Sequence, residues 1–436
     1  MPRWRPEPVS VLRLAGQSQP APFLTLPRSC NAPLRSTLLA DSWAEPGAHL
    51  IGGEPDPSDP RWRQASAESP ALGGCNLLPF TPSISLEPET QAGSTPTGLN
   101  VDVHLPQQPS ASANGLAEAD QKSTTVTLPP GMLVSPAAAH GLQACSETNI
   151  GFKGFQEYEP EVATAVFTPT LPEPFCPQAS KVGTVRVKTP LLAHELEGGI
   201  YLAQQTANPF GSLLALYIVA EDPVSGVLVK LAGRVTLNQE TGQIVTTFEN
   251  TPQTPFEDFK VHFFGGPTAQ LTTPAYCGTY TTTASFTPWS GSKTAPGTVQ
   301  SSSSFPITSS CTSAPNQQPF TPSLQAGSTN NQAGAFTPFT LTIANPDGDQ
   351  ALRGLTMHLP TGLAAMISSL KPCPEPQAAR NECGPESLIG HSTAYAGLGP
   401  DPYQFPGTVY LTGPYEGAPF GISVVTPAVA GSCPSC

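Results

Sequence analysis

The chain repeats itself, and this repetition constrains its fold more than any other feature of the sequence. The five residues PFTPS occur at Pro79–Ser83 and again at Pro319–Ser323, an offset of 240 residues. Further along, TVTLPPG at Thr125–Gly131 corresponds to TMHLPTG at Thr356–Gly362. Matched segments in a fixed order indicate tandem copies of one structural unit, because each copy repeats the same strands and turns.

A third match places part of another copy before the first complete one. LTLPRSC at Leu24–Cys30 corresponds to LTTPAYC at Leu271–Cys277, and Trp43 and Trp289 follow at nearly equal distances. We therefore expect the end of one repeat, one complete repeat and the beginning of a third. The last copy stops at AVAGSCPSC, so both ends are expected to be cut, with a natural three-part protein as the alternative.

Short stretches in which apolar and polar residues alternate run through each copy. Examples are LNVDVHL, GTVRV and TGQIVTTF, and their period of two is typical of half-buried strands. Turn-forming residues separate these stretches, as in EDPVSG at Glu221–Gly226 and NQETGQ at Asn238–Gln243. The sequence therefore predicts an all-β fold.

The length of the repeat sets the expected division into domains. A unit of about 240 residues fits two immunoglobulin-like β-sandwiches of about 100 residues each, so tandem sandwiches are predicted, two per repeat. The expected boundaries are a disordered tail at 1–20, the end of a preceding repeat at 21–75, two sandwiches at 76–192 and 193–300, and the truncated start of the next repeat at 301–436.

Eight of the ten cysteines lie in repeat-equivalent settings. Sequence alone leaves many pairings open, but the repetition favours local pairing within each copy. Disulfides persist in oxidising compartments, so the chain is expected to be extracellular or at a cell surface, although this sequence shows no signal peptide. The predicted structural disulfides are Cys30 with Cys75, Cys145 with Cys176, Cys277 with Cys311, and Cys373 with Cys383.

Metal binding is the alternative use of cysteines and carboxylates. Zinc favours tight CxxC clusters, and Cys433 and Cys436 have this spacing without a second ligand pair nearby, which favours a flexible tail. Asp347 and Asp349 share one turn and are weak candidates for calcium ligands, since calcium binds oxygen-rich loops. The turn alone also explains them, so no cofactor is predicted.

The acidic charge of the chain limits its partners. The formal net charge is −13 at pH 7, which repels phosphate backbones and anionic lipid headgroups, so nucleic acid is not an expected partner. The longest apolar run, Leu213–Ala220, is far shorter than the ~20 residues of a membrane-spanning helix, so no membrane insertion is expected within this sequence. A surface polymer or another protein stays open as a partner.

The sequence contains no recognisable catalytic motif. GxSxG, HExxH and a phosphate-binding glycine loop are all absent. Trp43 and Trp289 are expected to be core aromatics, because a tryptophan packed near a disulfide is common in β-sandwiches. A surface for stacking sugars is the alternative for this pair.

Five segments carry a family resemblance: CNLLPFTPS, TVTLPPGMLVSPAAAHGLQACS, ANPFGSLLALYIVAEDP, KVHFFGGP and YCGTYTTTASFTPW. They resemble segments of large uncharacterised exported bacterial proteins with tandem immunoglobulin-like β-sandwich repeats. The resemblance covers roughly residues 23–431 and implies an exported repeat protein. It implies no activity and no catalytic residues.

Together these features predict a function without catalysis. The expected protein is a secreted or cell-surface structural or adhesive repeat protein, present here as a fragment of a longer chain, and not an enzyme. A polysaccharide- or peptide-binding module is the alternative, as is the accessory part of a hydrolase whose catalytic domain lies outside this sequence.

Overall fold

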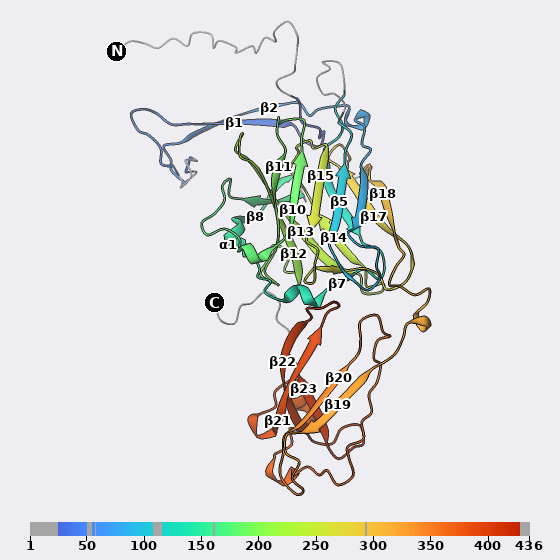
Figure 1. Cartoon of the computed structure of the whole chain (residues 1–436). Helices are drawn as coiled ribbons and strands as arrows, with labels where there is room; N and C mark the ends of the chain where they lie inside the picture. Colours follow the sequence, from blue (N-terminus) through green and yellow to red (C-terminus); the bar gives the residue numbers. More distant parts are fainter. Residues whose placement is uncertain are drawn as a thin grey trace, which may run out of the picture.

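The computed structural model describes residues 25–49, 55–56, 58–107, 116–159, 162–292 and 294–427. Strands dominate this part of the chain (Figure 1), which contains only two α-helices of four residues each, α1 (Glu147–Ile150) and α2 (Glu375–Ala378). The predicted all-β fold is therefore confirmed. The expected tail at 1–20 and the cysteines Cys433 and Cys436 lie outside the described residues.

Eleven strands between residues 83 and 307 form one antiparallel sheet, and we call this region of the chain the complete repeat. Their order across the sheet is β18 (Val299–Ile307), β17 (Gly278–Pro288), β6 (Gln121–Thr127), β14 (Ile244–Phe248), β13 (Val227–Leu237), β12 (Leu214–Asp222), β11 (Leu196–Leu202), β10 (Lys181–Lys188), β15 (Asp258–Phe263), β5 (Leu99–His104) and β3 (Ser83–Pro88).

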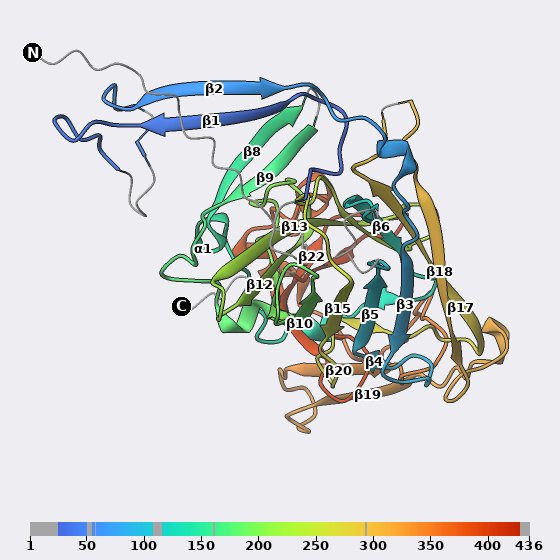
Figure 2. The same cartoon turned by 90° about the horizontal axis from the view of Figure 1, so that it is seen from above.

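The two edge strands of this sheet, β3 and β18, meet, so the sheet rolls up around a central space (Figure 2). The amide of Leu86 donates to Ser303 Oγ at 2.9 Å, and the amide of Ile84 donates to Ser301 Oγ at 3.2 Å. Serine hydroxyls of β18 thus satisfy edge-strand amides that an open sheet would leave exposed. Two of the four serines in the SSSS run of β18 therefore have a role at this seam.

The rolled sheet differs from the two separate sandwiches expected at 76–192 and 193–300. β10 and β11 lie on opposite sides of that boundary, yet they pair from Lys181 with Tyr201 to Val187 with Leu196. Moreover, β6 lies between β14 and β17. Alternating residues show that a strand has one buried face, but they do not show which strands share that face.

A disulfide-bonded segment covers the outside of strands β11 to β13. It contains α1 and the hairpin of β8 (Phe152–Glu159) and β9 (Val162–Phe167). Its apolar side chains pack on outward-facing residues of the sheet, including the fully buried Tyr217. The sheet therefore has apolar side chains on both faces in this region.

Lys230 of β13 binds this outer segment through hydrogen bonds to its backbone. The side chain is buried, and Nζ donates to the backbone oxygens of Ile150, Thr168 and Thr170 at 2.8 to 3.1 Å. Burial lowers the pKa of Lys230 from 10.5 to about 8. The lysine thus replaces water as the donor to three loop carbonyls.

The N-terminal hairpin consists of β1 (Leu34–Ala40) and β2 (Arg63–Ser69). The segment before it is anchored to the complete repeat by Arg28, whose Nη1 lies 2.9 Å from Asp120 Oδ1 and 2.7 Å from the Glu118 carbonyl oxygen. Both charged side chains are buried, and burial raises the pKa of Asp120 to about 6, opposed by the guanidinium of Arg28.

The C-terminal copy, residues 319–427, contains two further sheets. One pairs β19 (Ser323–Ser328) with β20 (Phe339–Ala344), and the other joins β21 (Leu388–Ala396), β22 (Tyr403–Thr412) and β23 (Gly421–Val425). A small sheet of β4 (Pro96–Thr97), β16 (Leu271–Thr272) and β7 (Leu133–Val134) belongs to the complete repeat. The described 3-10 helices are Cys75–Leu77, Pro136–Ala139 (η2), Gln178–Ser180, Pro315–Gln317, Ile367–Ser369 and Pro385–Ser387.

Equivalent segments of the two copies take the same strand register. β3 and β5 pair from Ser83 with His104, while β19 and β20 pair from Ser323 with Ala344, which is the same pairing shifted by 240 residues. Strands β10 and β21 each carry a register shift one residue after their start, next to Gly183 and Gly390.

Candidate functional site

Four disulfides join the described cysteines, and they are the same four pairs that the repeated cysteine pattern favours. Two of them occupy equivalent places, since the amide of Cys145 donates to the Leu202 carbonyl and the amide of Cys373 donates to the Leu411 carbonyl. Each therefore fixes a loop to the end of the corresponding strand. The pairs are Cys30–Cys75, Cys145–Cys176, Cys277–Cys311 and Cys373–Cys383.

The two tryptophans that were expected in the core have different environments. Trp289 is 3% exposed, its Nε1 donates to the Thr251 carbonyl at 3.0 Å, and Lys122 Nζ lies 4.9 Å from its ring centroid. Trp43, in contrast, is fully exposed, which corrects the expectation for this residue. The reason is that β17, which leads to Trp289, pairs with β6, whereas the N-terminal hairpin has no third strand among the described residues.

The two candidate calcium ligands bind backbone amides of different loops. Asp349 Oδ2 accepts from Thr321 N at 2.6 Å and from Thr321 Oγ1 at 2.9 Å, while Asp347 Oδ2 accepts from Gly399 N at 2.7 Å. Glu118 holds Thr81 of the complete repeat as Asp349 holds Thr321. Among the described residues, no group of three or more His, Cys, Asp or Glu side chains could hold a metal ion.

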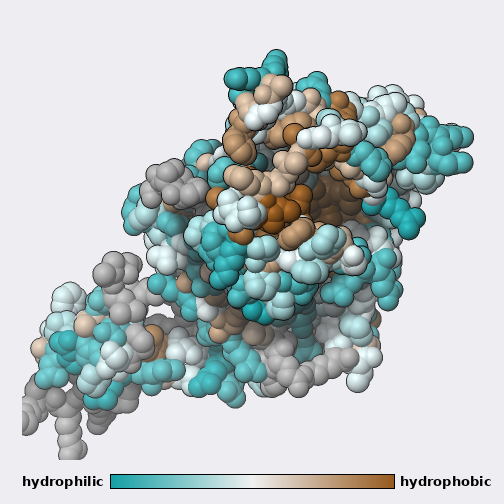
Figure 3. Space-filling view, turned by 90° about the horizontal axis from the view of Figure 1, so that it is seen from below, coloured by the Kyte–Doolittle hydropathy of each residue, from teal (hydrophilic) through white to brown (hydrophobic). Residues whose placement is uncertain are grey.

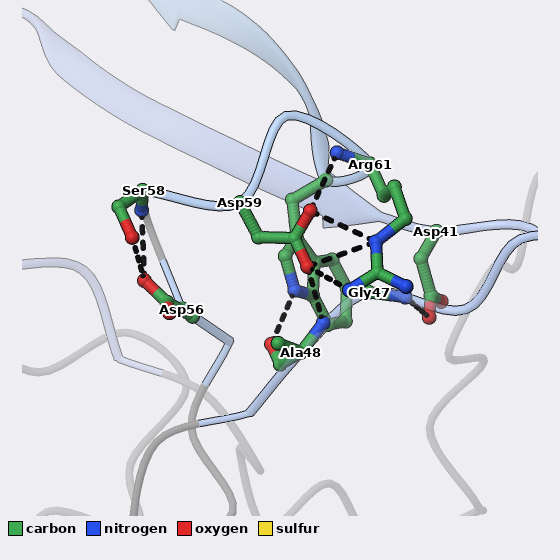
Figure 4. A network of polar contacts seen from close by, with 8 residues as sticks. Asp41, Gly47, Ala48, Asp56, Ser58, Asp59 and Arg61 are labelled. Atoms are coloured by element: carbon green, nitrogen blue, oxygen red, sulfur yellow. Dashed lines mark hydrogen bonds and ion pairs between the residues drawn. The ribbon is translucent and has the colours of Figure 1, made fainter.

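Acidic side chains also organise the loop of the N-terminal hairpin (Figure 4). Asp59 accepts from the amide of Ala48 at 2.7 Å and from Arg61 Nε at 3.0 Å, and Asp41 accepts from the amide of Gly47 at 2.9 Å. Hydrogen bonds from Arg61 hold the pKa of Asp59 well below its usual range. These carboxylates fold the loop on itself and do not converge on a common point.

A polar groove lies on the outer face of β3, β5, β15 and β10. Burial raises the pKa of Asp102, and Lys260 Nζ opposes this from 3.8 Å. Glu89 similarly lies 3.7 Å from His262 Nε2. Lys260 and Asp102 pair within the groove, whereas Arg186 pairs with Glu197 outside it. The described lining contains no Phe, Tyr or Trp ring on which a sugar could stack, and its polar residues are Ser85, Glu87, Asn100, Asp102, Thr184, Arg186, Lys260 and His262.

The interior of the rolled sheet contains a cavity of about 700 Å³. Side chains from β3, β5, β6 and β10 to β15 form most of its wall, and none of the residues that line it is charged. The wall is mainly aliphatic, as shown by Val101, Val126, Val187, Leu202, Leu216, Val229, Leu231, Val235 and Val261.

The next copy contributes to one end of this cavity. Tyr403 and Phe405 of β22 line it together with residues of η2. The two rings pack edge to face with centroids 4.5 Å apart, and Gly397 approaches Ala137 of η2 so closely that a Cβ atom there would lie 2.8 Å from the Ala137 side chain. The cavity is therefore a joint product of two adjacent copies.

Polar atoms without a hydrogen-bond partner in the described structure lie on the cavity lining. Thr124 and Ser135 are 6% and 2% exposed, and neither hydroxyl has a partner. Oε1 of Gln121 and Oε1 of Gln270 are likewise buried and unpartnered. Gln121 and Thr124 share β6, whereas the amide of Ser135 donates to the carbonyl of Gln270, so the four atoms form two separate groups.

Sequence reasoning missed both the groove and the cavity. The alternating pattern identifies inward-facing residues one strand at a time, but the wall of the cavity is assembled from many strands without a local motif. No family model matches the sequence, and no curated protein and no solved structure matches the chain. Within the part of the chain that the structure describes, no helix is long and apolar enough to cross a membrane.

Proposed function

We propose that this chain is a non-catalytic structural or adhesive repeat protein of the cell exterior, built from successive disulfide-linked β units. The single observation that carries the proposal is that two copies share the same strand register, together with a carboxylate that holds the threonine of PFTPS in each. A repeat array requires units that can follow one another along the chain, and it does not require a set of catalytic residues.

The four disulfides support the exterior location. They are spread over all the copies, so that each copy is held by at least one covalent link. Such links persist where the environment is oxidising. The resemblance to exported bacterial repeat proteins agrees with this location. Because the eleven strands of the complete repeat share one sheet, the repeating unit of the array is this rolled sheet.

The alternative of a sugar-stacking surface common to the copies has less support. It requires both Trp43 and Trp289 to be exposed, and Trp289 is buried. The described lining of the polar groove also contains no Phe, Tyr or Trp ring. We therefore propose a peptide or a polymer only as the partner that an adhesive array would contact.

A thiol measurement on the natively exported protein tests the proposal. The protein is unfolded without reductant, and free thiols are counted before and after reduction. We expect the eight disulfide-bonded cysteines to react only after reduction, and we expect protease treatment of intact cells to remove the chain. Eight or more free thiols before reduction, or a chain that is protected inside the cell, would overturn the proposal.

A further inference from the structure

We propose that the cavity inside the complete repeat binds one uncharged lipid that has a single hydrocarbon chain and a head bearing a hydroxyl group, such as a long-chain alcohol. Four features of the cavity carry this inference: its volume, its uncharged lining, its unpartnered polar atoms and its covered end. The inference concerns a binding site, and it goes beyond the proposed structural role.

The volume of the cavity argues that it is occupied. Protein interiors are packed as densely as organic crystals, and voids larger than a water molecule are few. A space of about 700 Å³ is within the range of sites that hold small organic ligands. Since an apolar cavity offers water few hydrogen bonds, an apolar molecule is the favoured occupant.

The lining argues that the occupant is uncharged. Although the chain carries a net charge of −13, no Asp, Glu, Lys, Arg or His side chain lines the cavity. A fatty-acid carboxylate would lose its hydration there without gaining a cationic partner, which is strongly unfavourable. The interior thus selects against ionised lipids, and the aliphatic wall suits a flexible hydrocarbon chain.

The unpartnered polar atoms argue for a hydroxyl head. Oε1 of Gln121 and Oε1 of Gln270 are acceptors without a donor, and the hydroxyls of Thr124 and Ser135 can donate or accept. A plain hydrocarbon satisfies none of these atoms, and an ester supplies no donor to the glutamine oxygens. A hydroxyl group can donate to an amide oxygen and accept from a neighbouring hydroxyl at the same time.

The covered end indicates that the C-terminal copy completes the site. Tyr403 and Phe405 of the C-terminal copy line one end beside η2, and His140 of the following loop lies 3.3 Å from Asp401 Oδ2. An occupant of the cavity is therefore covered at this end by aromatic rings of the next copy.

Binding is tested first on the wild-type protein with its disulfides intact. The uncharged fluorophore N-phenyl-1-naphthylamine is titrated in, and 1-hexadecanol, hexadecane and palmitate compete for its site at pH 8. We expect fluorescence enhancement, and displacement by 1-hexadecanol at a concentration ~10-fold or more below that of palmitate, because the charged head cannot be buried unpaired. Organic extracts of the purified protein are analysed by mass spectrometry for a bound neutral lipid.

Two neighbouring residues of β13 provide a matched pair of variants. Val235 lines the cavity, whereas Thr236 is exposed on the outer face. We expect Val235→Phe to weaken probe binding ~10-fold or more by filling the cavity, and Thr236→Phe to leave it unchanged. Val101→Phe on β5 is the second filling variant, in case Val235→Phe fails to fold. Circular dichroism verifies the fold of each variant.

The role of the hydroxyl groups has its own variant. Thr124→Val keeps the shape of the side chain and removes the hydroxyl, so we expect the preference for 1-hexadecanol over hexadecane to fall while probe binding stays. Absence of probe enhancement in the wild type, equal binding by both β13 variants, or preference for palmitate would overturn the inference. None of these results depends on the thiol count that tests the structural role.

Discussion

The complete repeat and the C-terminal copy start with equivalent strands but bury them to very different extents. Ile84 of β3 is 6% exposed, while its register equivalent in β19, Leu324, is 56% exposed. In the complete repeat, β3 meets β18, and Leu86 of β3 lines the interior cavity. In the C-terminal copy, the five described strands form two separate sheets, and apolar side chains surround an open hollow (Figure 3).

The two copies show that alternation of apolar and polar residues specifies a strand but not the burial of its apolar face. Both copies encode the hairpin locally, so both form it with the same register. Burial of its apolar face, however, depends on strands that are distant in sequence, such as β17 and β18. The difference can be tested at several equivalent positions.

The largest expected effect concerns the disulfides. Replacing both Cys145 and Cys176 by Ala should lower the free energy of unfolding by ~4 kcal/mol, because this bond closes a loop with a sequence separation of 31 residues. Replacing Cys373 and Cys383 should cost less, ~3 kcal/mol, because their separation is 10 residues. Urea unfolding measures the free energy of unfolding of both double variants. A larger loss for the variant without Cys373 and Cys383 would contradict this order.

A smaller effect is expected for the equivalent apolar residues. Ile84→Ala should cost ~3 kcal/mol, since it removes buried atoms at the seam of the rolled sheet. Leu324→Ala should change stability by no more than ~0.5 kcal/mol, since that side chain is exposed. Chemical denaturation of the two variants in parallel gives the answer, and equal losses would show that both strands are buried alike.

Lys230 should also make the stability of the folded chain depend on pH. The pKa of Lys230 is lowered to about 8 in the folded chain from 10.5, so between these values the unfolded chain binds more protons. Stability from this residue should therefore rise as the pH increases from 8 to 10.5. We expect the wild type to gain stability relative to Lys230→Met over this interval.

The control for this prediction is Lys371→Met, a lysine of the C-terminal copy outside the contacts that bury Lys230. The measurement is the midpoint of urea unfolding at several pH values. A wild-type curve that runs parallel to that of Lys230→Met would contradict the burial of this ammonium group.

Local features were predictable from the sequence, and features shared between distant strands were not. The alternation in LNVDVHL gave β5, and the repeated cysteines gave the pairs that the structure contains. The burial of Trp289 followed from its place after a strand near a disulfide. Each of these depends on residues close together or on a pattern repeated along the chain.

The features that could not be predicted depend on contacts between strands that are distant in the sequence. Trp43 has the same sequence setting as Trp289, yet it is exposed because its hairpin pairs with no other described strand. The serines of β18 show their role only once β3 is known to lie beside them. The cavity has no motif, since Val101, Val235 and their neighbours come from separate strands.

Amide hydrogen exchange followed by NMR tests the closure of the complete repeat most directly. The amides of Ile84 and Leu86 bond to serine hydroxyls of β18, whereas their equivalents in β19, Leu324 and Ala326, lie at an edge with no such strand in the described chain. We predict slow exchange for the first pair and fast exchange for the second. Equally fast exchange at all four amides would contradict a sheet that closes between β3 and β18.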